Sequence, residues 1–267
     1  MSVNRLSTAE REQAILSRLR ESQVVSVPEL EGLLGVSPAT TRRDLQSLHE
    51  RGLLRRIRGG ATLGDRFRVE PVFRDKESQN AEAKRAIART ALELVEDYDR
   101  IYLDGGSTVL TLARLLGERR GLTVVTNSLE AATVLMAMPH RLIVVGGEFR
   151  ALSRTLVGPL SACTIDRIHV DKAFMGTIGF TLPDGMSTTD PNEAFTKERV
   201  LPRANQIILL ADSTKLGMPS FAGSGDAGDI DILVTETVTP QLRIELEETG
   251  IRLRLAGGPR SDASQEE

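Results

Sequence analysis

Residues 24–61 read VVSVPELEGLLGVSPATTRRDLQSLHERGLLRRIRGGA, and this stretch decides the fold of the first part of the chain. Its pattern predicts a helix, a tight turn, a second helix and a short basic hairpin. Gly35 is placed to end the first of these helices, and Ser37 followed by Pro38 is a typical start for the next one. This order of elements is that of a winged helix-turn-helix, whose second helix enters the major groove of DNA.

Apolar residues around the turn recur at helical spacing. A separate amphipathic helix is predicted over 8–21, before the quoted stretch. Ser26 and Glu29 fit a capping box at the start of the helix that precedes the turn. The side chains that we expect in the core of this small domain are Ile15, Leu19, Leu30, Leu33, Leu34, Leu45 and Leu48.

The second helix and the hairpin carry the residues that we expect to contact DNA. Arginine can bond a guanine bidentately, and short hydroxyl side chains suit phosphates and thymine methyl groups. Thr40, Arg43 and Ser47 share a helix face separate from the buried stripe, and the hairpin arginines suit the DNA backbone. The alternative is a helical bundle without DNA binding or a dimerisation module. The expected DNA contacts are Ser37, Pro38, Thr40, Thr41, Arg42, Arg43, Ser47, Arg55, Arg56 and Arg58.

Charge is distributed unevenly along the chain. Residues 1–62 hold ten Arg and no Lys against seven acidic residues, a balance of +3. Because the whole chain carries a formal charge of −3, the remainder carries −6. A basic cluster at one end of an acidic chain suggests a surface for a polyanion, with a solvated basic face as the alternative.

Composition restricts the class of protein. The 267 residues, 40% of them hydrophobic, suit two domains with their own cores. A single Cys163 and three scattered histidines argue against a disulfide scaffold and against a metal site. No signal peptide and no membrane-spanning segment is evident, so we expect a cytoplasmic protein.

The chain is expected to divide into a winged domain over 1–63, a linker over 64–80, an effector-binding domain over 81–256 and a disordered tail over 257–267. The linker assignment follows from a polar stretch without a clear period. The tail is polar and follows the last predicted strand.

Strand-like and helical patterns alternate through the larger domain, which predicts an α/β fold with a mostly parallel sheet covered on both faces. Ligands of such sheets bind at the carboxyl ends of strands. The predicted strands are 100–104, 122–127, 141–147, 171–176, 206–212, 231–236 and 251–256.

Asp104, Gly105, Gly106, Ser107 and Thr108 follow the first of these strands and form the strongest ligand motif. The two glycines allow close approach of a ligand, and the start of the next helix with its hydroxyl groups favours an anion. The spacing fits neither a dinucleotide fingerprint nor a P-loop, so a mononucleotide or a sugar phosphate is favoured. The alternative is a strand–helix turn that needs no ligand.

Other polar motifs follow neighbouring strands, and we expect them to share one pocket, with Lys215 as its cationic member. Asp190, Glu193 and Lys197 start a later helix, where they form either a cap with a surface ion pair or a group that holds sugar hydroxyls. The expected effector contacts are Asp104, Gly105, Gly106, Ser107, Thr108, Thr126, Asn127, Ser128, Gly146, Gly147, Asp190, Glu193, Lys197 and Lys215.

The stretch VSPATTRRDLQSLHERGLLRRIRGGA resembles the DNA-binding signature of the DeoR family of bacterial sugar-operon regulators. The family usually has Ile where Thr41 stands and His where Arg58 stands. The first difference puts a polar residue near the edge of the core, and the second adds a charge to the wing.

The larger domain also resembles the DeoR effector domain, which is similar in fold to ribose-5-phosphate isomerase. The motifs LDGGSTVLTLARLL, TVVTNS, VVGGEFR, VGP, DKAFMGTIGF, TTDPNEAFTKERV and LLADSTKLG occur in the family's order, and the resemblance covers about 5–256. It implies that residues 104–108 and 126–128, with Lys215, bind a phosphorylated sugar or related phosphometabolite. The segment 217–229 departs from the family's pattern and is rich in small residues, which suggests a flexible lid.

The expected function is a repressor of a carbohydrate operon that is released by a phosphorylated sugar, with activation by the effector as a further option. The partners expected are double-stranded operator DNA and a second copy of the chain, as a dimer or tetramer, with no membrane and no cofactor. The alternatives are a sugar-phosphate isomerase with a DNA-binding arm and a nucleotide-binding adaptor. Isomerisation needs a carboxylate, and residues 176–179, where the isomerase family carries acidic residues, have none. We therefore predict no catalytic residue.

Overall fold

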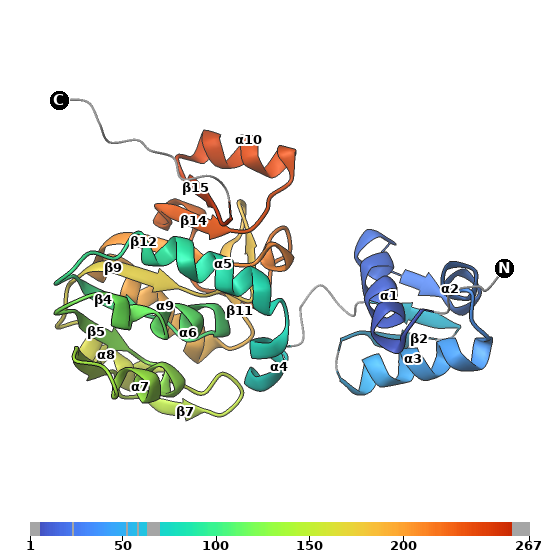
Figure 1. Cartoon of the computed structure of the whole chain (residues 1–267), viewed down its shortest axis with the longest axis horizontal. Helices are drawn as coiled ribbons and strands as arrows, with labels where there is room; N and C mark the ends of the chain where they lie inside the picture. The colour runs from blue at the N-terminus through green and yellow to red at the C-terminus, as the bar shows by residue number, and fades with distance from the viewer. Residues whose placement is uncertain (1–5, 23, 52, 58, 63–69, 258–267) are drawn as a thin grey trace. The chain divides into compact units, whose positions relative to one another are not determined.

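The chain divides into two compact units, Met1–Pro71 and Val72–Glu267, each with its own hydrophobic core. Figure 1 shows the computed structural model, coloured along the chain. The residues that the structure describes are 6–22, 24–51, 53–57, 59–62 and 70–257.

The described residues of the first unit form three helices and a small antiparallel sheet. The helices are α1 (Thr8–Ser22), α2 (Val27–Leu34) and α3 (Pro38–Glu50). The strands lie in the order β1 (Val24–Ser26), β3 (Gly60–Thr62) and β2 (Arg55–Ile57). This is the winged helix-turn-helix that the sequence predicts, with β1 as an additional strand that pairs with β3.

The ends of α2 and α3 lie where predicted, but the Glu29 carboxylate, expected to complete a capping box with Ser26, accepts from Arg18 Nε at 2.8 Å. The Ser26 hydroxyl accepts a hydrogen bond from the Glu29 amide at 3.3 Å, and Ser37 accepts one from the Thr40 amide at 3.3 Å. Gly35 ends α2 with a φ of +63°, a left-handed conformation that glycine adopts without strain. The prediction that Leu33 lies in the core is wrong. Its side chain is 51% exposed, whereas Leu30 and Leu34 of the same helix are buried.

The second unit is built on a seven-stranded parallel sheet in the order β15-β14-β12-β9-β4-β5-β6. β4 and β9 are adjacent near its centre, and the chain runs outward from them in both directions. The strands are β4 (Arg100–Leu103), β5 (Thr123–Thr126), β6 (Arg141–Val144), β9 (Val170–Met175), β12 (Ala204–Leu210), β14 (Ile232–Thr235) and β15 (Arg252–Leu255).

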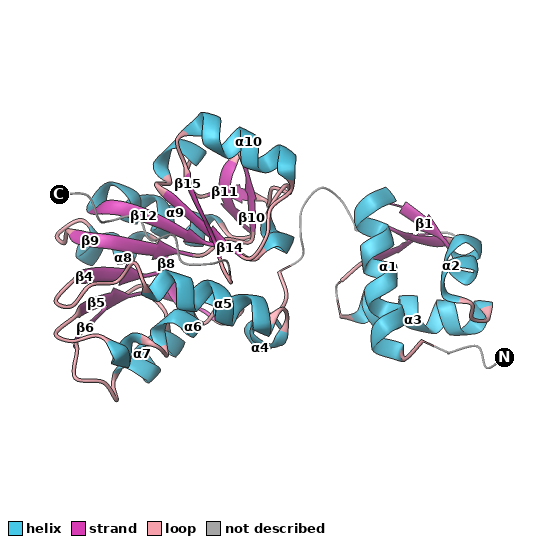
Figure 2. Ribbon diagram, turned by 45° about the horizontal axis from the view of Figure 1, so that its top comes forward, coloured by secondary structure: helices cyan, strands magenta, loops and turns pink. Residues whose placement is uncertain are grey.

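Helices cover both faces of this sheet (Figure 2). One core forms beneath α5 (Ala81–Leu92), α6 (Ser107–Ala113) and α7 (Leu129–Leu135). A second core forms on the opposite face, where α8 (Pro159–Ile165), α9 (Pro191–Val200) and α10 (Pro240–Thr249) contribute. Alternate strand residues enter different cores, as Leu103 and Tyr102 do, because side chains of a strand alternate between its faces.

Smaller elements flank the sheet. A hairpin of β7 (Glu148–Arg150) and β8 (Thr155–Val157) follows β6. A separate antiparallel sheet joins β10 (Gly179–Thr181), β11 (Gly185–Thr188) and β13 (Ala222–Gly223). Short 3-10 helices cover Leu116–Glu118, Leu201–Arg203, Ser213–Lys215 and Ala227–Asp229.

The segment expected to be a flexible lid, 217–229, is instead tied into that small sheet. β13 pairs with β11, and the Ser220 amide donates to the Ser187 hydroxyl at 2.7 Å. Within this segment Gly225 has a φ of +139°, which favours glycine, and a Cβ added there would lie 2.5 Å from Leu201 Cδ1. On the neighbouring strand, a Cβ added to Gly179 would lie 2.2 Å from the Met218 carbonyl oxygen.

The range expected to be a linker also contains structure. A short helix, α4 (Phe73–Ser78), lies in the second unit, and Phe73 is 3% exposed in its core. A helix of six residues is too short to show a period in sequence. Residues 63–69 lie outside the described residues. Among the helices that the structure describes, none is long and apolar enough to span a membrane.

Candidate functional site

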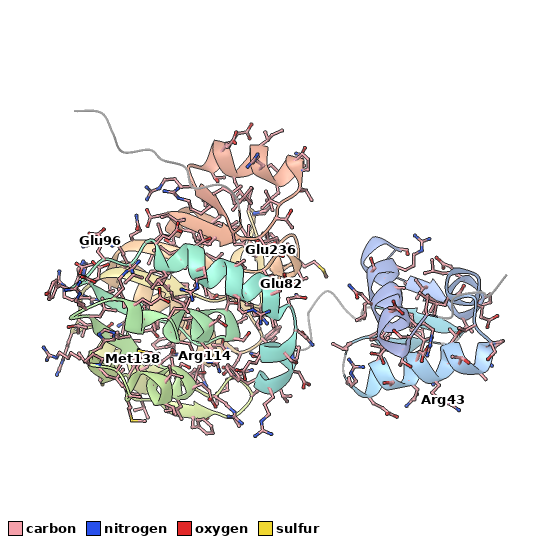
Figure 3. The ribbon with its side chains drawn as sticks, viewed as in Figure 1. Arg43, Glu82, Glu96, Arg114, Met138 and Glu236 are labelled. Carbon is pink, nitrogen blue, oxygen red and sulfur yellow. The ribbon has the colours of Figure 1, made fainter. Side chains whose placement is uncertain are left out.

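The first turns of α3 present two exposed arginines, Arg42 and Arg43. Figure 3 labels Arg43 on this helix. Thr40 lies beside them, half-buried, with its hydroxyl 3.0 Å from that of Ser37. Ser37 and Pro38 are exposed at the helix start. The start of α3 therefore offers guanidinium and hydroxyl groups of the kind that contact DNA bases and phosphates.

Two expected DNA contacts on α3 are engaged inside the protein. Thr41 is fully buried, and its hydroxyl donates to the Ser37 carbonyl oxygen at 3.3 Å. Thr41 therefore belongs to the core and does not present a surface to DNA. Ser47 is half-buried and donates to a Glu12 carboxylate oxygen at 3.4 Å, which links α3 to α1.

A largely buried ion pair joins α1 to α3. Arg11 donates from Nε to Asp44 Oδ2 at 2.7 Å and from Nη2 to Oδ1 at 3.1 Å. The Arg11 side chain is 13% exposed and that of Asp44 is 5% exposed. The hydrogen bond with Asp44 raises the pKa of Arg11. A bidentate pair fixes orientation as well as distance, so it holds the exposed face of α3 in place.

The basic wing contacts the same helix. Arg56 Nη1 donates to Gln46 Oε1 at 2.7 Å, which places this exposed guanidinium beside α3. Arg55 lies in β2. Arg58 lies outside the described residues.

A pocket in the second unit opens at the carboxyl ends of β4, β9 and β12. The chain reverses its strand order between β4 and β9, and such switch points are where parallel sheets bind ligands. The pocket is lined by Lys76, Gln79, Asn80, Lys84, Gly105, Gly106, Ser107, Thr108, Val109, Ser153, Gly176, Thr177, Ile178, Glu193, Lys197, Leu210, Ala211, Asp212, Thr214 and Lys215.

The turn after β4 forms one wall and depends on its two glycines. Gly106 has a φ of +139°, which strains any other residue. A Cβ on Gly105 would lie 2.2 Å from the Thr155 methyl carbon. Ser107 and Thr108, at the start of α6, follow this turn and line the pocket.

Lysine side chains bring positive charge to the pocket. The chain has five lysines, and Lys76, Lys84, Lys197 and Lys215 line this pocket. The first three are less than 10% exposed. A lysine is a compact point charge that binds phosphate.

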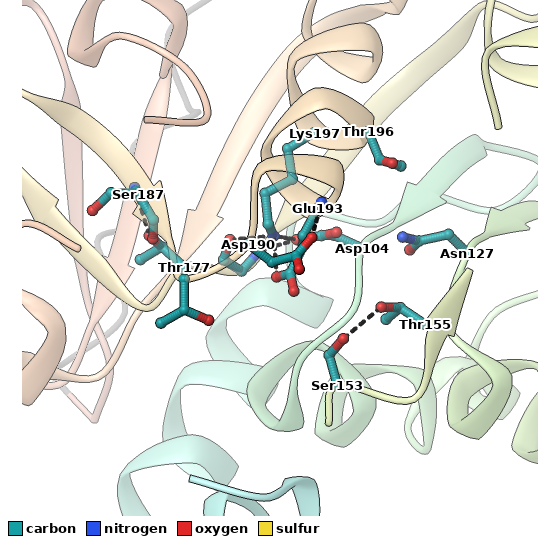
Figure 4. A network of polar contacts seen from close by, with 12 residues as sticks. Asp104, Asn127, Ser153, Thr155, Thr177, Ser187, Asp190, Glu193, Thr196 and Lys197 are labelled. Carbon is teal, nitrogen blue, oxygen red and sulfur yellow. Dashed lines mark hydrogen bonds and ion pairs between the residues drawn. The ribbon is translucent and has the colours of Figure 1, made fainter. Parts of the chain in front are cut away.

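Two carboxylates, those of Asp104 and Glu193, lie beside the Lys197 ammonium (Figure 4). Asp104 is 2% exposed, forms an ion pair with Lys197 and accepts the Gly176 amide at 3.0 Å. Glu193 lies 3.8 Å from Lys197 and accepts from Arg150 Nη1 at 3.2 Å. Glu193 lines the pocket, and its carboxylate can accept hydrogen bonds from hydroxyl groups.

Comparisons with known proteins match both units. A family model described as the DeoR-like helix-turn-helix domain covers residues 11–67, and one described as the DeoR C terminal sensor domain covers residues 79–237. The chain belongs to the DeoR family. It is a DNA-binding transcriptional regulator and not an enzyme, as the named regulators to which it is similar indicate.

Several relatives match this DeoR-family chain over most of their length. It is 35% identical over 229 residues to the uncharacterized HTH-type transcriptional regulator FruR of Bacillus subtilis, covering 86% of this chain and 91% of that protein. It is 35% identical over 249 residues to the HTH-type transcriptional regulator GolR of Listeria innocua, covering 92% and 98%. It is 33% identical over 254 residues to a putative aga operon transcriptional repressor of Escherichia coli O157:H7, covering 94% of each.

A solved structure with partial likeness is ribose 5-phosphate isomerase A from Methanocaldococcus jannaschii. It shares 23% sequence identity with this DeoR-family chain, at a TM-score of 0.39, over 52% of this chain and 55% of that one.

The structure brings together half of the effector contacts that we expected for this DeoR-family sensor domain. Asp104 lies behind the pocket, joined to Lys197. Seven expected residues line the pocket directly: Gly105, Gly106, Ser107, Thr108, Glu193, Lys197 and Lys215.

The motif after β5 lies outside the lining and is engaged in the fold. Thr126 donates to the Leu103 carbonyl oxygen at 2.7 Å, Ser128 caps α7, and Asn127 donates to the Leu156 carbonyl oxygen at 3.3 Å. The motif therefore braces the neighbouring strand end.

Gly146, Gly147 and Asp190 also lie outside the lining. Gly147 packs against β8, where an added Cβ would lie 2.8 Å from the Val157 carbonyl oxygen. Asp190 caps α9 and lies 3.4 Å from Arg150.

The sequence analysis did not identify several of the residues that line the pocket. Three of them, Lys76, Asn80 and Lys84, lie in or between α4 and α5, and two others are Ser153 and Thr177. The scarcity of lysine in this chain is a signal that could have found the first and third, since arginine supplies almost every other cation. Ser153 donates to or accepts from Thr155 at 2.7 Å in the loop between β7 and β8.

Proposed function

We propose that this DeoR-family regulator is a repressor of a carbohydrate-metabolism operon and that its pocket binds a phosphorylated sugar or related phosphometabolite. The observation that carries the proposal is the convergence of four of the five lysines on one pocket beside the Gly105–Gly106 turn. Two carboxylates, Glu193 and Asp212, line the same pocket, so the cations outnumber the lining acids.

The chemistry of the lining favours a sugar phosphate over a nucleotide. Ser107, Thr108 and Thr177 offer hydroxyl groups, and Glu193 can accept from the hydroxyls of a sugar. No aromatic side chain occurs among the described lining residues, so a nucleotide base would lack a stacking partner.

Effector binding and DNA binding are linked equilibria, and this linkage explains how the effector releases DNA. The effector lowers operator affinity only if it binds the DNA-free arrangement more tightly than the DNA-bound one. We propose a dimer or tetramer whose winged domains hold repeated half-sites, because two-fold related recognition helices match repeated DNA sites.

Thermal-shift measurements on the full chain test the pocket, using ribose 5-phosphate, fructose 6-phosphate, other sugar phosphates and inorganic phosphate. A ligand at about 100 times its Kd stabilises by about 2.7 kcal/mol. We expect one sugar phosphate to stabilise the wild type and not Lys215→Ala. Lys172→Ala is the matched control. Lys172 Nζ lies 2.8 Å from Asp99 Oδ2, and Lys172 is not among the described residues that line the pocket.

Fluorescence anisotropy with a duplex selected from random DNA tests the link to DNA. We expect the stabilising ligand to lower the affinity of the wild type, and Lys215→Ala to bind DNA normally without that response. Failure of every sugar phosphate to stabilise the wild type would contradict the proposed effector. Loss of DNA binding in folded Lys215→Ala would contradict the separation of the two sites.

A further inference from the structure

Lys84 joins the pocket to the corner between α4 and α5. Its side chain is on α5 and 4% exposed, and its ammonium donates to the carbonyl oxygens of Lys76 and Gln79. These carbonyls lie in the last turn of α4 and at its end, where a helix leaves carbonyl groups without helical partners. Lys84 therefore caps α4 from the following helix.

A second contact ties the same corner to the loop after β12. Asn80 lies between the two helices with a φ of +50°. Its amide nitrogen donates to Asp212 Oδ1 at 3.1 Å and lies 3.5 Å from the Thr214 hydroxyl. The corner is thus held by a buried ammonium on one side and by a side-chain amide on the other.

This corner is also a wall of the pocket. Lys76, Gln79, Asn80 and Lys84 all line it, and so do their partners Asp212 and Thr214. The same segment lies at the start of the second unit, because that unit begins at Val72 and α4 begins at Phe73. A ligand in the pocket therefore contacts the part of the sensor domain that directly follows the DNA-binding unit in the chain.

We propose that Lys84 contacts the anionic group of the effector and transmits pocket occupancy to α4, with Asn80 as the second holding point of that corner. The inference rests on the proposed function, since it needs an anionic effector in this pocket. An ammonium has three donors, and two of those on Lys84 go to backbone carbonyls, so the third is left for the ligand.

The electrostatics favour the same arrangement. Burial lowers the pKa of Lys84, the Asp212 carboxylate opposes that effect, and the nearby Lys76 adds to it. A ligand anion favours the charged form of Lys84 and hence the state in which it holds the end of α4. The effector thereby binds the state with a fixed corner more tightly than a state with a loosened one, and this difference in affinity is the coupling.

Hydrogen exchange of the full chain tests the inference, with ribose 5-phosphate, fructose 6-phosphate and inorganic phosphate as probes. We expect a probe that stabilises the wild type to slow amide exchange over 73–80 at least several-fold. Lys84→Met has a similar length and no N–H donor, so it should bind the probe about tenfold more weakly or worse. At saturating probe it should show neither slowed exchange in α4 nor a change in operator affinity.

A second variant separates coupling from binding. Asn80→Gly removes the side-chain tether and accepts the positive φ, and because Asn80 also lines the pocket, it is compared with the wild type at saturating probe, where it should lose most of the operator response. Lys172→Met is the matched control and should behave as the wild type in every assay. Should Lys84→Met fail to fold by circular dichroism, Asn80→Gly still decides the question.

The outcomes separate the two proposals. If no probe binds the wild type, the proposed effector is wrong, and the inference fails with it. If a probe binds but exchange over 73–80 is unchanged, or if Lys84→Met or Asn80→Gly at saturation keeps the full operator response, the role of this corner is overturned while the effector proposal stands.

Discussion

Replacement of Asp104 by alanine should destabilise the sensor domain by about 4 kcal/mol. The side chains of Asp104 and Lys197 are each 2% exposed, so the substitution removes the nearest carboxylate from a buried ammonium. Breaking such a pair costs about 3–5 kcal/mol. The Glu193 carboxylate remains 3.8 Å from the Lys197 ammonium and partly compensates its charge, so we expect a cost near the lower limit. The Gly176 amide, which donates to Asp104 at 3.0 Å, adds about 1 kcal/mol.

Thermal unfolding of the full chain, followed by hydrogen exchange of β4 and α9, measures this cost. A unit of this size loses about 2–4 °C per kcal/mol, so the transition should fall by about 8–16 °C. Glu118→Gln is the matched control. It breaks the Arg89–Glu118 pair, whose side chains are 60% and 49% exposed, and should cost less than about 1 kcal/mol.

The double variant Asp104→Ala with Lys197→Met distinguishes an uncompensated charge from a general loss of packing. Removing both charges should recover much of the stability, because the cost lies mainly in a buried ammonium that has lost its nearest carboxylate. Additive effects of the two substitutions, or an Asp104→Ala variant as stable as Glu118→Gln, would refute this reasoning. A large loss would also mean that Asp104→Ala is unsuitable as a selective probe of effector binding.

Three further expectations concern single side chains. Arg43→Ala should weaken operator binding by about 1–3 kcal/mol if Arg43 contacts a base. If Arg43 contacts a phosphate, the slope of log K against log salt concentration should instead fall by about 1. Anisotropy titrations at several salt concentrations distinguish these results, and unchanged binding would show that Arg43 is not part of the DNA interface. Leu34→Ala should cost about 2–4 kcal/mol in urea unfolding and the exposed Leu33→Ala less than about 0.5, whereas equal losses would contradict the observed orientation of α2. Burial raises the pKa of Tyr102 well above its usual value of 10.0, so its contribution to stability is present below that value and is lost as pH rises toward the folded pKa. Melting temperatures of Tyr102→Phe should therefore fall less steeply above pH 10 than those of the wild type, and parallel curves would count against a buried hydroxyl.

Local patterns in the sequence predicted the elements of the winged domain because they depend on neighbouring residues. The hydroxyl at Ser37, the proline after it and the glycine at Gly35 act within one turn of their helices, and each does so as expected. The face of a short helix is harder to predict. Leu33 and Leu34 are adjacent and both fit a broad apolar stripe with Leu30, but the buried face of this short helix is narrow and leaves Leu33 51% exposed.

The position of Thr41 along α3 indicates burial, even though its side chain is polar. Thr41, Leu45 and Leu48 are spaced i, i+4 and i+7, which is the spacing of one buried stripe. Its polar hydroxyl favoured a surface role, but a threonine in a helix can bond the carbonyl oxygen four residues earlier, as Thr41 does with Ser37. Burial of this hydroxyl therefore leaves no unsatisfied polar group.

The composition of the pocket depends on strand order, which local sequence does not contain. Motifs after β4 and β12 meet because both strands lie beside β9, whereas the motifs after β5 and β6 lie farther toward the edge of the sheet. Lys76 and Lys84 reach the same pocket from α4 and α5, helices that precede every strand of this sheet in the chain. A segment whose polarity suggested a linker thus supplies part of the binding wall, because Lys76 in it is 8% exposed and lines the pocket, whereas Arg74 and Asp75 face solvent. Polar composition alone is consequently a weak guide to a linker in a chain whose ligand is expected to be an anion.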